Sequence, residues 1–259
     1  MTVLTFANWI KTVPEWITDL PEWLQRFFFQ FYQTFIYGDR WTFFTDGLCT
    51  TFIVTIGALI LGIIIGMVVA IIRSTHDNSR SKPRLVLRTF NSICKIYVTV
   101  LRGTPLMVQL LIMGFVVMVP KSSFETYMCA IVTLGINSGA YVAEIARSGI
   151  MSINAGQMEA GRSLGLNYRQ TMTNIILPQA FKNILPALGN ELIALLKETS
   201  LVTVIALQDV TKAAQVIQSK TYAPVIPYIS LAVIYLVLVM ALTKLLAILE
   251  RRLRKGDKR

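Results

Sequence analysis

Residues 50–72 form a run of 23 positions without a charged side chain, and this run constrains the fold more than any other feature. About 20 consecutive apolar residues are enough for a helix to cross the hydrocarbon layer of a membrane. Ala58, Gly62, Gly66 and Ala70 recur at every fourth position, which predicts a small helix face that packs closely against a neighbour. Since 54% of all residues are hydrophobic and 15% are charged, the sequence predicts a protein embedded in a bilayer.

Four more apolar stretches predict further spans at residues 96–119, 127–148, 188–207 and 226–249. The first of these is interrupted at residues 102–105 by Arg-Gly-Thr-Pro. Because proline removes a backbone donor and glycine loosens a helix, we expect a broken helix there. The sequence therefore predicts an all-α membrane protein with about five transmembrane helices and with its termini on opposite sides.

Basic residues gather in three segments and predict the orientation. They are Arg73, Arg80, Lys82, Arg84 and Arg88 after the first span, Arg162 and Arg169 after the third, and Arg251, Arg252, Arg254, Lys255, Lys258 and Arg259 in the tail. Loops rich in lysine and arginine stay in the cytoplasm. We therefore expect the N-terminus outside and the C-terminus inside. The net charge of +11 is explained by this topology and by contact with anionic lipid, so no nucleic acid partner is predicted.

The first 46 residues differ from the rest because aromatic residues dominate them. Trp9, Trp16 and Trp23 are spaced by seven, and a cluster of phenylalanines follows. Such residues favour the headgroup level of a membrane, and the segment lacks the pattern of a cleavable signal. A sixth span here is the alternative, although Arg26 and Gln30 interrupt it. Three regions are expected: an extracytoplasmic or interfacial segment at 1–46, a membrane-spanning domain at 47–250 and a basic cytoplasmic tail at 251–259.

Catalytic and metal chemistry find no support in the sequence. Cys49, Cys94 and Cys129 show no ligand spacing and are expected to be packing residues, and His76 is the single histidine. Neither a phosphate-binding loop nor a nucleophile elbow is found. We predict no catalytic residue, no metal ligand and no cofactor in this chain.

The segment between the third and fourth spans, residues 152–178, is expected to be structured. Asn154 and Asn167 each precede a glutamine by three positions, which resembles a capping box and predicts two helix starts. Gly165 lies where the first helix would end in a left-handed conformation, and Pro178 is expected to end the second. The alternative is an ordinary amphipathic linker.

The spacing within this segment resembles the EAA loop of bacterial ABC-importer permeases. The matching residues are Glu159, Ala160, Gly161, Gly165 and Ile-Ile-Leu-Pro at 175–178. The resemblance to the polar amino acid subfamily, the histidine, glutamine and arginine permease type, covers most of residues 95–205. It rests on RGTPL at 102–106, YVAEIAR at 141–147, GQME at 156–159, LPQA at 177–180, LGNE at 188–191 and KETSL at 197–201. One departure is Gly161, which stands where the family usually has a second alanine and costs the helix about 1 kcal/mol.

This resemblance implies a multi-pass permease subunit of the bacterial cytoplasmic membrane. In such importers the loop forms a coupling helix that fits a groove on a separate ATPase, and ATP drives alternating access. Glu159 would then make polar contacts with the ATPase, Ala160 and Gly161 would allow close approach, and Gly165 would set the turn. The implied partners are two nucleotide-binding ATPase subunits that hold ATP and magnesium, a second permease subunit that is identical or related, an extracytoplasmic amino-acid-binding protein and the lipid bilayer.

Polar residues within the spans are the candidates for a translocation path, because they are costly in lipid and usually face an aqueous path or a bundle interior. Helical spacing places Asn137, Tyr141 and Glu144 on one face of the third span. The path candidates are Asn137, Tyr141, Glu144, Asn190 and Glu191. Arg102, Lys197 and Glu198 are expected to serve gating or structural pairing. Pairing of Glu144 with Arg147 is the structural alternative.

The substrate implied by the resemblance is a polar amino acid, and intramembrane carboxylates suit a cationic one such as arginine or lysine. Acidic and amide side chains stay open. The rival functions are a self-sufficient secondary transporter or channel that uses Glu144, Glu191 and Glu198, and a membrane scaffold without transport. Five spans without a detectable internal repeat favour the importer over an autonomous carrier.

Overall fold

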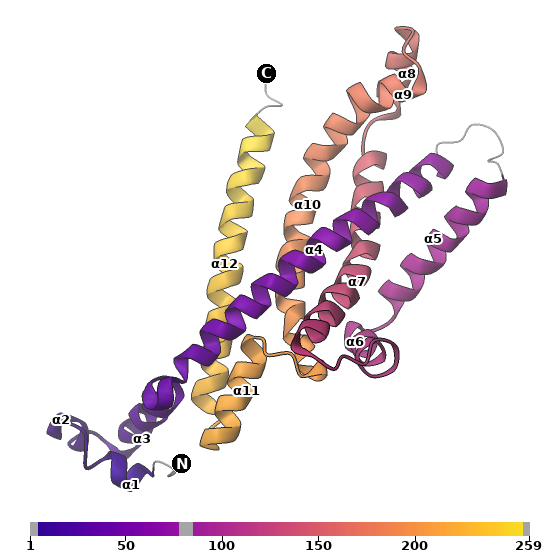
Figure 1. Cartoon of the computed structure of the whole chain (residues 1–259). Coiled ribbons are helices and arrows are strands. Elements are labelled where there is room, and N and C mark those ends of the chain that lie inside the picture. The colour runs from indigo at the N-terminus through magenta and orange to yellow at the C-terminus, as the bar shows by residue number, and fades with distance from the viewer. Residues whose placement is uncertain (1–4, 78–84, 256–259) are drawn as a thin grey trace. The chain divides into compact units, whose positions relative to one another are not determined.

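The computed structural model describes residues 5–77 and 85–255. All regular secondary structure in these residues is helical (Figure 1). Arg80, Lys82, Arg84, Lys258 and Arg259, on which part of the orientation argument rests, lie outside the described residues. The chain divides into two compact units, Met1–Thr50 with Gln208–Val237 and Thr51–Leu207 with Leu238–Arg259.

The larger unit holds most of the helices. In chain order they are most of α4 (Trp41–Asp77), α5 (Leu85–Gly103), α6 (Leu106–Ile112) with a π-helical turn (Met113–Val117), α7 (Ser123–Met151), α8 (Ala155–Ser163), α9 (Tyr168–Thr171) with a π-helical turn (Met172–Ile176), α10 (Leu177–Glu198), a 3-10 segment (Thr199–Ile205) and the end of α12 (Val225–Lys255). In Figure 1, α8 and α9 lie beyond the ends of α7 and α10.

Helix α7 is the centre of this unit and packs against α10, α5 and α4. The small face predicted for the first span meets it directly. A Cβ atom at Gly66 would lie 2.6 Å from Cβ of Val142, and one at Gly62 would lie 2.9 Å from Oγ of Ser138. Ala58 and Ala70 are fully buried. The prediction of close packing along this face is confirmed.

Three described helices are long and apolar enough to cross a membrane: α4, α7 and Val225–Leu253 of α12. A fourth span results if Leu85–Gly103 and Leu106–Val117, which are bent by 105° at the break, count as one. The break predicted at residues 102–105 is confirmed, because α5 ends at Gly103 and Pro105, which is extended, is the N-cap of α6.

The span expected at 188–207 differs from the observed helix. Helix α10 begins at Leu177, eleven residues earlier, and its α-helical part ends at Glu198. Pro178 lies in the first turn, where a missing N–H costs nothing, and Pro186 is accommodated within the helix. Hydropathy alone placed the start after both prolines, and α10 is not among the helices that pass the length and composition test.

The smaller unit contains α1 (Phe6–Trp9), α2 (Glu15–Thr18), α3 (Glu22–Phe31), a π-helical turn (Tyr32–Ile36), a 3-10 turn (Tyr37–Asp39), the start of α4, α11 (Val210–Thr221) and the start of α12. Its core is formed by Phe44, Val210, Ala213, Ala214 and Ile217. Helix α4 therefore begins six residues before the domain boundary expected at 47.

Asp209 joins α4 to α11 in this unit. Its carboxylate accepts the N–H groups of Thr211 and Lys212 at 3.1 and 2.9 Å and so caps α11. A Cβ atom at Gly47 would lie 2.8 Å from the Asp209 backbone, so glycine is required for this approach. Burial raises the pKa of the Asp209 carboxyl, while the two N–H groups act in the opposite direction.

Candidate coupling segment and translocation path

The two helix starts predicted in residues 152–178 are present. Asn154 caps α8 by accepting the Gly156 N–H at 2.8 Å. Asn167 caps α9 in a complete capping box, in which the Gln170 N–H donates to its side chain and its own N–H donates to Gln170, both at 2.9 Å. Only the second start therefore has the full box.

Helix α8 ends in the left-handed turn that Gly165 was predicted to make. Gly165 has φ +84°, a conformation that a residue with a Cβ adopts only under strain. The Leu166 N–H donates to the Gly161 carbonyl at 3.1 Å, and the Gly165 N–H donates to the Arg162 carbonyl at 3.0 Å. This pair of bonds is a Schellman motif, and it fixes the direction in which the chain leaves α8.

The expectation that Pro178 ends the second helix is wrong. The backbone is helical without interruption from Tyr168 through α9, the π-helical turn and α10 to Glu198. The π-helical turn precedes Pro178, which then occupies the first turn of α10. Helix α9 is therefore continuous with a helix that carries two path candidates, Asn190 and Glu191, and two pairing candidates, Lys197 and Glu198.

Gly161 lies on the inner face of the α8–α9 segment and is buried. A Cβ atom there would lie 2.5 Å from Cγ2 of Thr171, so glycine permits α8 to pack on α9. Glu159 and Ala160 are exposed, and Leu164 at the tip is 80% exposed. Of the two residues expected to allow close approach of the ATPase, Ala160 and Gly161, Gly161 thus makes its close approach within the segment.

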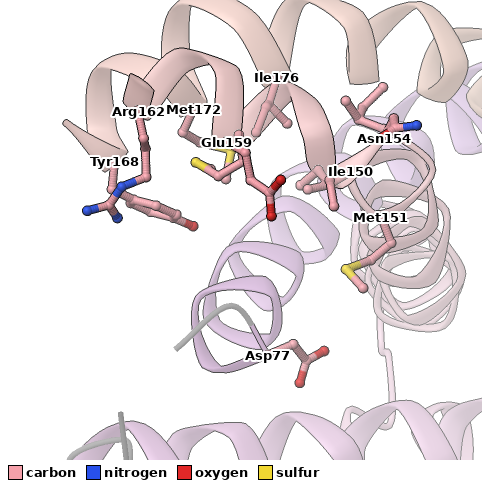
Figure 2. A pocket seen from close by; sticks show the side chains of 12 residues that line it. Asp77, Ile150, Met151, Asn154, Glu159, Arg162, Tyr168, Met172 and Ile176 are labelled. Carbon is pink, nitrogen blue, oxygen red and sulfur yellow. The ribbon is translucent and has the colours of Figure 1, made fainter. Parts of the chain in front are cut away.

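A cleft of about 400 Å³ lies between this segment and the ends of α4 and α7 (Figure 2). Figure 2 shows Arg162 and Tyr168 on one side of the cleft, Ile150 and Met151 on the other, and the Glu159 carboxylate between them. Asp77, at the end of α4, borders the same space.

An ion network joins α4 to α7 next to this cleft. Glu144 forms an ion pair with Arg73 and a second one, at 3.4 Å, with Arg147, which also lies 3.5 Å from Asp77. The predicted alternative that Glu144 pairs with Arg147 is confirmed, and Arg73 and Asp77 are additions that the sequence did not suggest. Arg73 and Asp77 lie four residues apart at the end of α4, and this spacing indicates that both side chains lie on the same face of the helix.

Asn137 stabilises the broken helix. It is 4% exposed, and its amide donates to Gln109 at 2.9 Å and to the Leu101 carbonyl at 3.2 Å. Gln109 in turn donates to the carbonyls of Leu101 and Thr104. These bonds satisfy carbonyls that the break leaves without helical partners. Gln109 was not singled out from the sequence, although a polar residue four positions after Pro105 in an apolar stretch was a signal.

The remaining candidates do not form a single cluster. The Arg102 guanidinium lies 5.1 Å from the centre of the Tyr141 ring and shares a cavity with Glu144. Glu191 instead accepts a hydrogen bond from Ser138 at 2.7 Å. Asn190 is exposed and donates to the Pro186 carbonyl of its own helix. Among the described residues, no ion pair joins Lys197 or Glu198 to a partner.

Helix α5 carries a polar stripe that the sequence analysis missed. Its members are exposed and recur every three or four residues: Arg88, Ser92, Lys95, Thr99 and Arg102. A cavity of about 350 Å³ lies between this stripe, Arg73 and Glu144. The spacing is visible in the sequence, but the span expected at residues 96–119 leaves out Arg88, Ser92 and Lys95. Because charged side chains are costly in lipid, the stripe is expected to face water or protein.

Comparison with known proteins shows the family of the chain. A family model described as the inner membrane component of binding-protein-dependent transport systems matches residues 62–255. The chain belongs to this family. It is therefore a multi-pass component of the cytoplasmic membrane, and its family is one of transport components rather than of enzymes.

Individual relatives agree with this assignment. The chain is 39% identical over 216 residues to the arginine transport system permease protein ArtQ of Bacillus subtilis, covering 83% of this chain and 94% of ArtQ. It is 36% identical to a putative glutamine transport system permease protein GlnP of Rickettsia typhi, covering 82% and 93%. A crystal structure of an amino acid ABC transporter with histidines matches with a TM-score of 0.73 at 41% identity, covering 82% and 94%. The MetNI methionine ABC transporter, at 18% identity and a TM-score of 0.66, shares the fold.

Proposed function

We propose that this chain is the permease subunit of an ATP-driven importer of polar amino acids. The observation that carries the proposal is the family match over residues 62–255, together with relatives named for amino acid transport that are aligned over more than 80% of the chain. The α8–α9 segment adds support, because it is a folded, capped projection and not an unstructured linker.

The coupling step is proposed to act through the outer face of α8. Glu159 and Ala160 are exposed there and would contact a nucleotide-binding ATPase, while Gly161 holds α8 against α9. Two such ATPases would bind ATP and magnesium, so hydrolysis would take place outside this chain. Because the backbone is helical from Tyr168 to Glu198, movement of the segment would be passed directly along α10 toward Glu191.

A second connection would carry the same movement to α7. The Asn183 amide of α10 donates to Ser152, at the end of α7, at 2.9 Å. The ion network around Glu144 then ties α7 to α4. Displacement of α8 and α9 would thus move three helices together, as alternating access requires.

The translocation path is proposed to pass two polar clusters, one between α7 and α5 and one between α7 and α10. One contains Tyr141, Glu144, Arg102 and the α5 stripe, and the other contains Ser138 and Glu191. No described cation pairs with Glu191 or Glu198, so these carboxylates would suit a cationic amino acid, the first class to test. A second permease subunit, identical or related, and an extracytoplasmic amino-acid-binding protein would complete the importer, with the N-terminus outside.

The test is recovery of the ATPase with the tagged chain from its native membrane. Gly165→Arg should abolish recovery and uptake while leaving membrane insertion intact, because it disrupts the Schellman turn. Gly38→Arg is the matched control, since Gly38 also has positive φ and open space around its Cα but lies outside the α8–α9 segment. A wild-type chain that purifies alone and still transports would contradict the proposal and favour a secondary transporter.

The energy source gives a second test. Uptake of labelled arginine, histidine and glutamine into vesicles that contain the complex should require ATP and persist after ion gradients are abolished. Uptake that follows a proton or sodium gradient without ATP would contradict the importer assignment.

A further inference from the structure

Helix α3 in the smaller unit presents a row of aromatic side chains to its surroundings. Trp23, Phe27 and Phe31 recur at every fourth position and are 68%, 47% and 43% exposed. The polar face of the same helix carries Glu22 and Arg26, which form an exposed ion pair at 2.6 Å. Large aromatic residues aligned on one face of a surface helix indicate a partner for that face.

The helix is part of a folded segment, residues 5–40. Its Phe29 packs on the rings of Phe6 and Trp9 with centroids 5.5 and 5.3 Å apart, and Tyr32 lies 6.2 Å from Trp9. Trp9 is only 5% exposed. Helix α1 therefore covers one side of α3, and the exposed row is the side that the segment itself leaves uncovered.

A tight corner holds α3 beside the first residue of the membrane-spanning α4. Gly38 and Asp39 both have left-handed backbone conformations, with φ +65° and +52°. Arg40 closes the corner by donating to the Gln33 carbonyl at 2.7 Å and by lying over the Tyr37 ring. Four residues separate the π-helical turn from Trp41, and a chain of that length spans at most about 14 Å.

This short connection decides which partner the aromatic row meets. Trp41 begins α4 and is 51% exposed, and an uncharged apolar stretch follows from residue 47. Helix α3 therefore cannot move far from the membrane surface that α4 enters. Tryptophan and phenylalanine on one face, with an ion pair on the other, match the layered polarity of a lipid interface.

We propose that α3 lies in the headgroup layer of the bilayer with Trp23, Phe27 and Phe31 inserted toward the acyl chains, so that residues 5–40 act as an interfacial anchor for α4. Residues 5–46 contain three basic and five acidic side chains, so attraction to anionic lipid does not drive the contact. The burial of the three aromatic side chains in the bilayer drives it. The matched family region begins at residue 62, so this surface lies outside the part of the chain that carries the proposed transport function.

Tryptophan fluorescence reports on this segment and on the residue that follows it, because the four tryptophans of the chain are Trp9, Trp16, Trp23 and Trp41. The full chain with Trp23 as its single tryptophan, the others changed to phenylalanine, would be reconstituted in phosphatidylcholine vesicles. We expect strong quenching by brominated phosphatidylcholine and weak quenching by acrylamide. A matched chain that keeps only Trp9, which lies inside the ring cluster, should be quenched weakly by both.

Two other outcomes would overturn the proposal. Quenching of Trp23 by acrylamide and not by brominated lipid would place the row in water. Protection from both quenchers would place it against protein, either a second copy of the chain or a binding protein. Neither outcome depends on ATPase binding or on uptake, so failure here is distinct from failure of the proposed function.

Substitution and lipid charge sharpen the test. Phe27→Asp in the Trp23 chain should abolish most of the lipid quenching and shift the emission to longer wavelength. Glu22→Gln, on the polar face of the same helix, should change neither. Addition of phosphatidylglycerol should leave the quenching unchanged; stronger quenching in anionic vesicles would show a contact driven by charge and would contradict the proposal.

Discussion

The α8–α9 segment and the N-terminal segment, residues 5–40, have similar backbone elements but expose different kinds of side chain. Each contains short helices and one left-handed glycine, Gly165 between α8 and α9 and Gly38 at the corner that leads into α4. The first exposes Glu159 and Arg162 beside an ion network, whereas the second exposes Trp23, Phe27 and Phe31. The same backbone device thus presents a polar surface in one place and an aromatic surface in the other.

This difference predicts different partners. Charged and polar groups with one exposed leucine suit a groove on a water-soluble protein, because both sides can satisfy hydrogen bonds there. A row of aromatic rings suits the lipid interface, where the partner offers no fixed hydrogen-bonding groups. Substitutions in one segment should therefore leave the readout of the other unchanged.

The largest expected effect is that of Trp9→Ala in the N-terminal segment. Removal of a buried tryptophan costs about 3 kcal/mol or more, which exceeds what a segment of this size can lose and stay folded. We expect rapid proteolysis of the first 40 residues in vesicles and loss of lipid quenching of Trp23. Recovery of the ATPase should be unaffected, and its loss would show that the two segments are coupled.

Glu144→Ala tests the ion network around Glu144 and is expected to have the next largest effect on stability. It leaves Arg73 and Arg147 without their shared carboxylate, and breaking a buried ion pair costs about 3 to 5 kcal/mol. Because these side chains are partly exposed, we expect about 2 kcal/mol, seen as a lower melting temperature of the purified chain.

Arg88→Ala is the control for this substitution, since it removes one exposed charge at the end of the α5 stripe. A melting temperature equally lowered by both variants would show that the network has no special role. Lipid quenching of Trp23 should persist in both.

The sequence predicts those features of the fold and of the candidate site that depend on the local chemistry of a few residues. The caps at Asn154 and Asn167, the turn at Gly165 and the break before Pro105 follow from backbone preferences of single residues. The small face of α4 follows from a spacing of four. These features need no knowledge of distant contacts.

Features that depend on neighbours far along the chain could not be predicted in this way. The pairing of Arg73 with Glu144 joins residues 71 positions apart, and the contact of Gly161 with Thr171 depends on how α8 folds back. The burial of Asn137 depends on Gln109 and on the carbonyls of the broken helix. The prediction that Pro178 ends a helix was wrong because proline ends a helix in some positions and lies in the first turn in others.

Loss of the capping box should have a moderate effect confined to the α8–α9 segment. Asn167→Ala removes the acceptor for the Gln170 N–H and should destabilise the start of α9 by about 1 kcal/mol. Weaker ATPase recovery, by up to about fivefold, is the expected result of a binding surface that is ordered less often. Asn167→Asp keeps an acceptor and should retain most of the recovery; equal loss in both variants would argue against the capping role.

The smallest and sharpest test exchanges the two glycines for alanine. At Gly165 and at Gly38 the space around the Cα is open, so alanine introduces backbone strain of about 1 kcal/mol without a clash. Since the strain is nearly equal, the readouts separate the surfaces: Gly165→Ala should reduce ATPase recovery and leave lipid quenching of Trp23 intact. Gly38→Ala should do the reverse, because it loosens only the corner between α3 and α4. If both variants reduce the same readout, the two segments do not serve separate partners, and the difference between their surfaces needs another explanation.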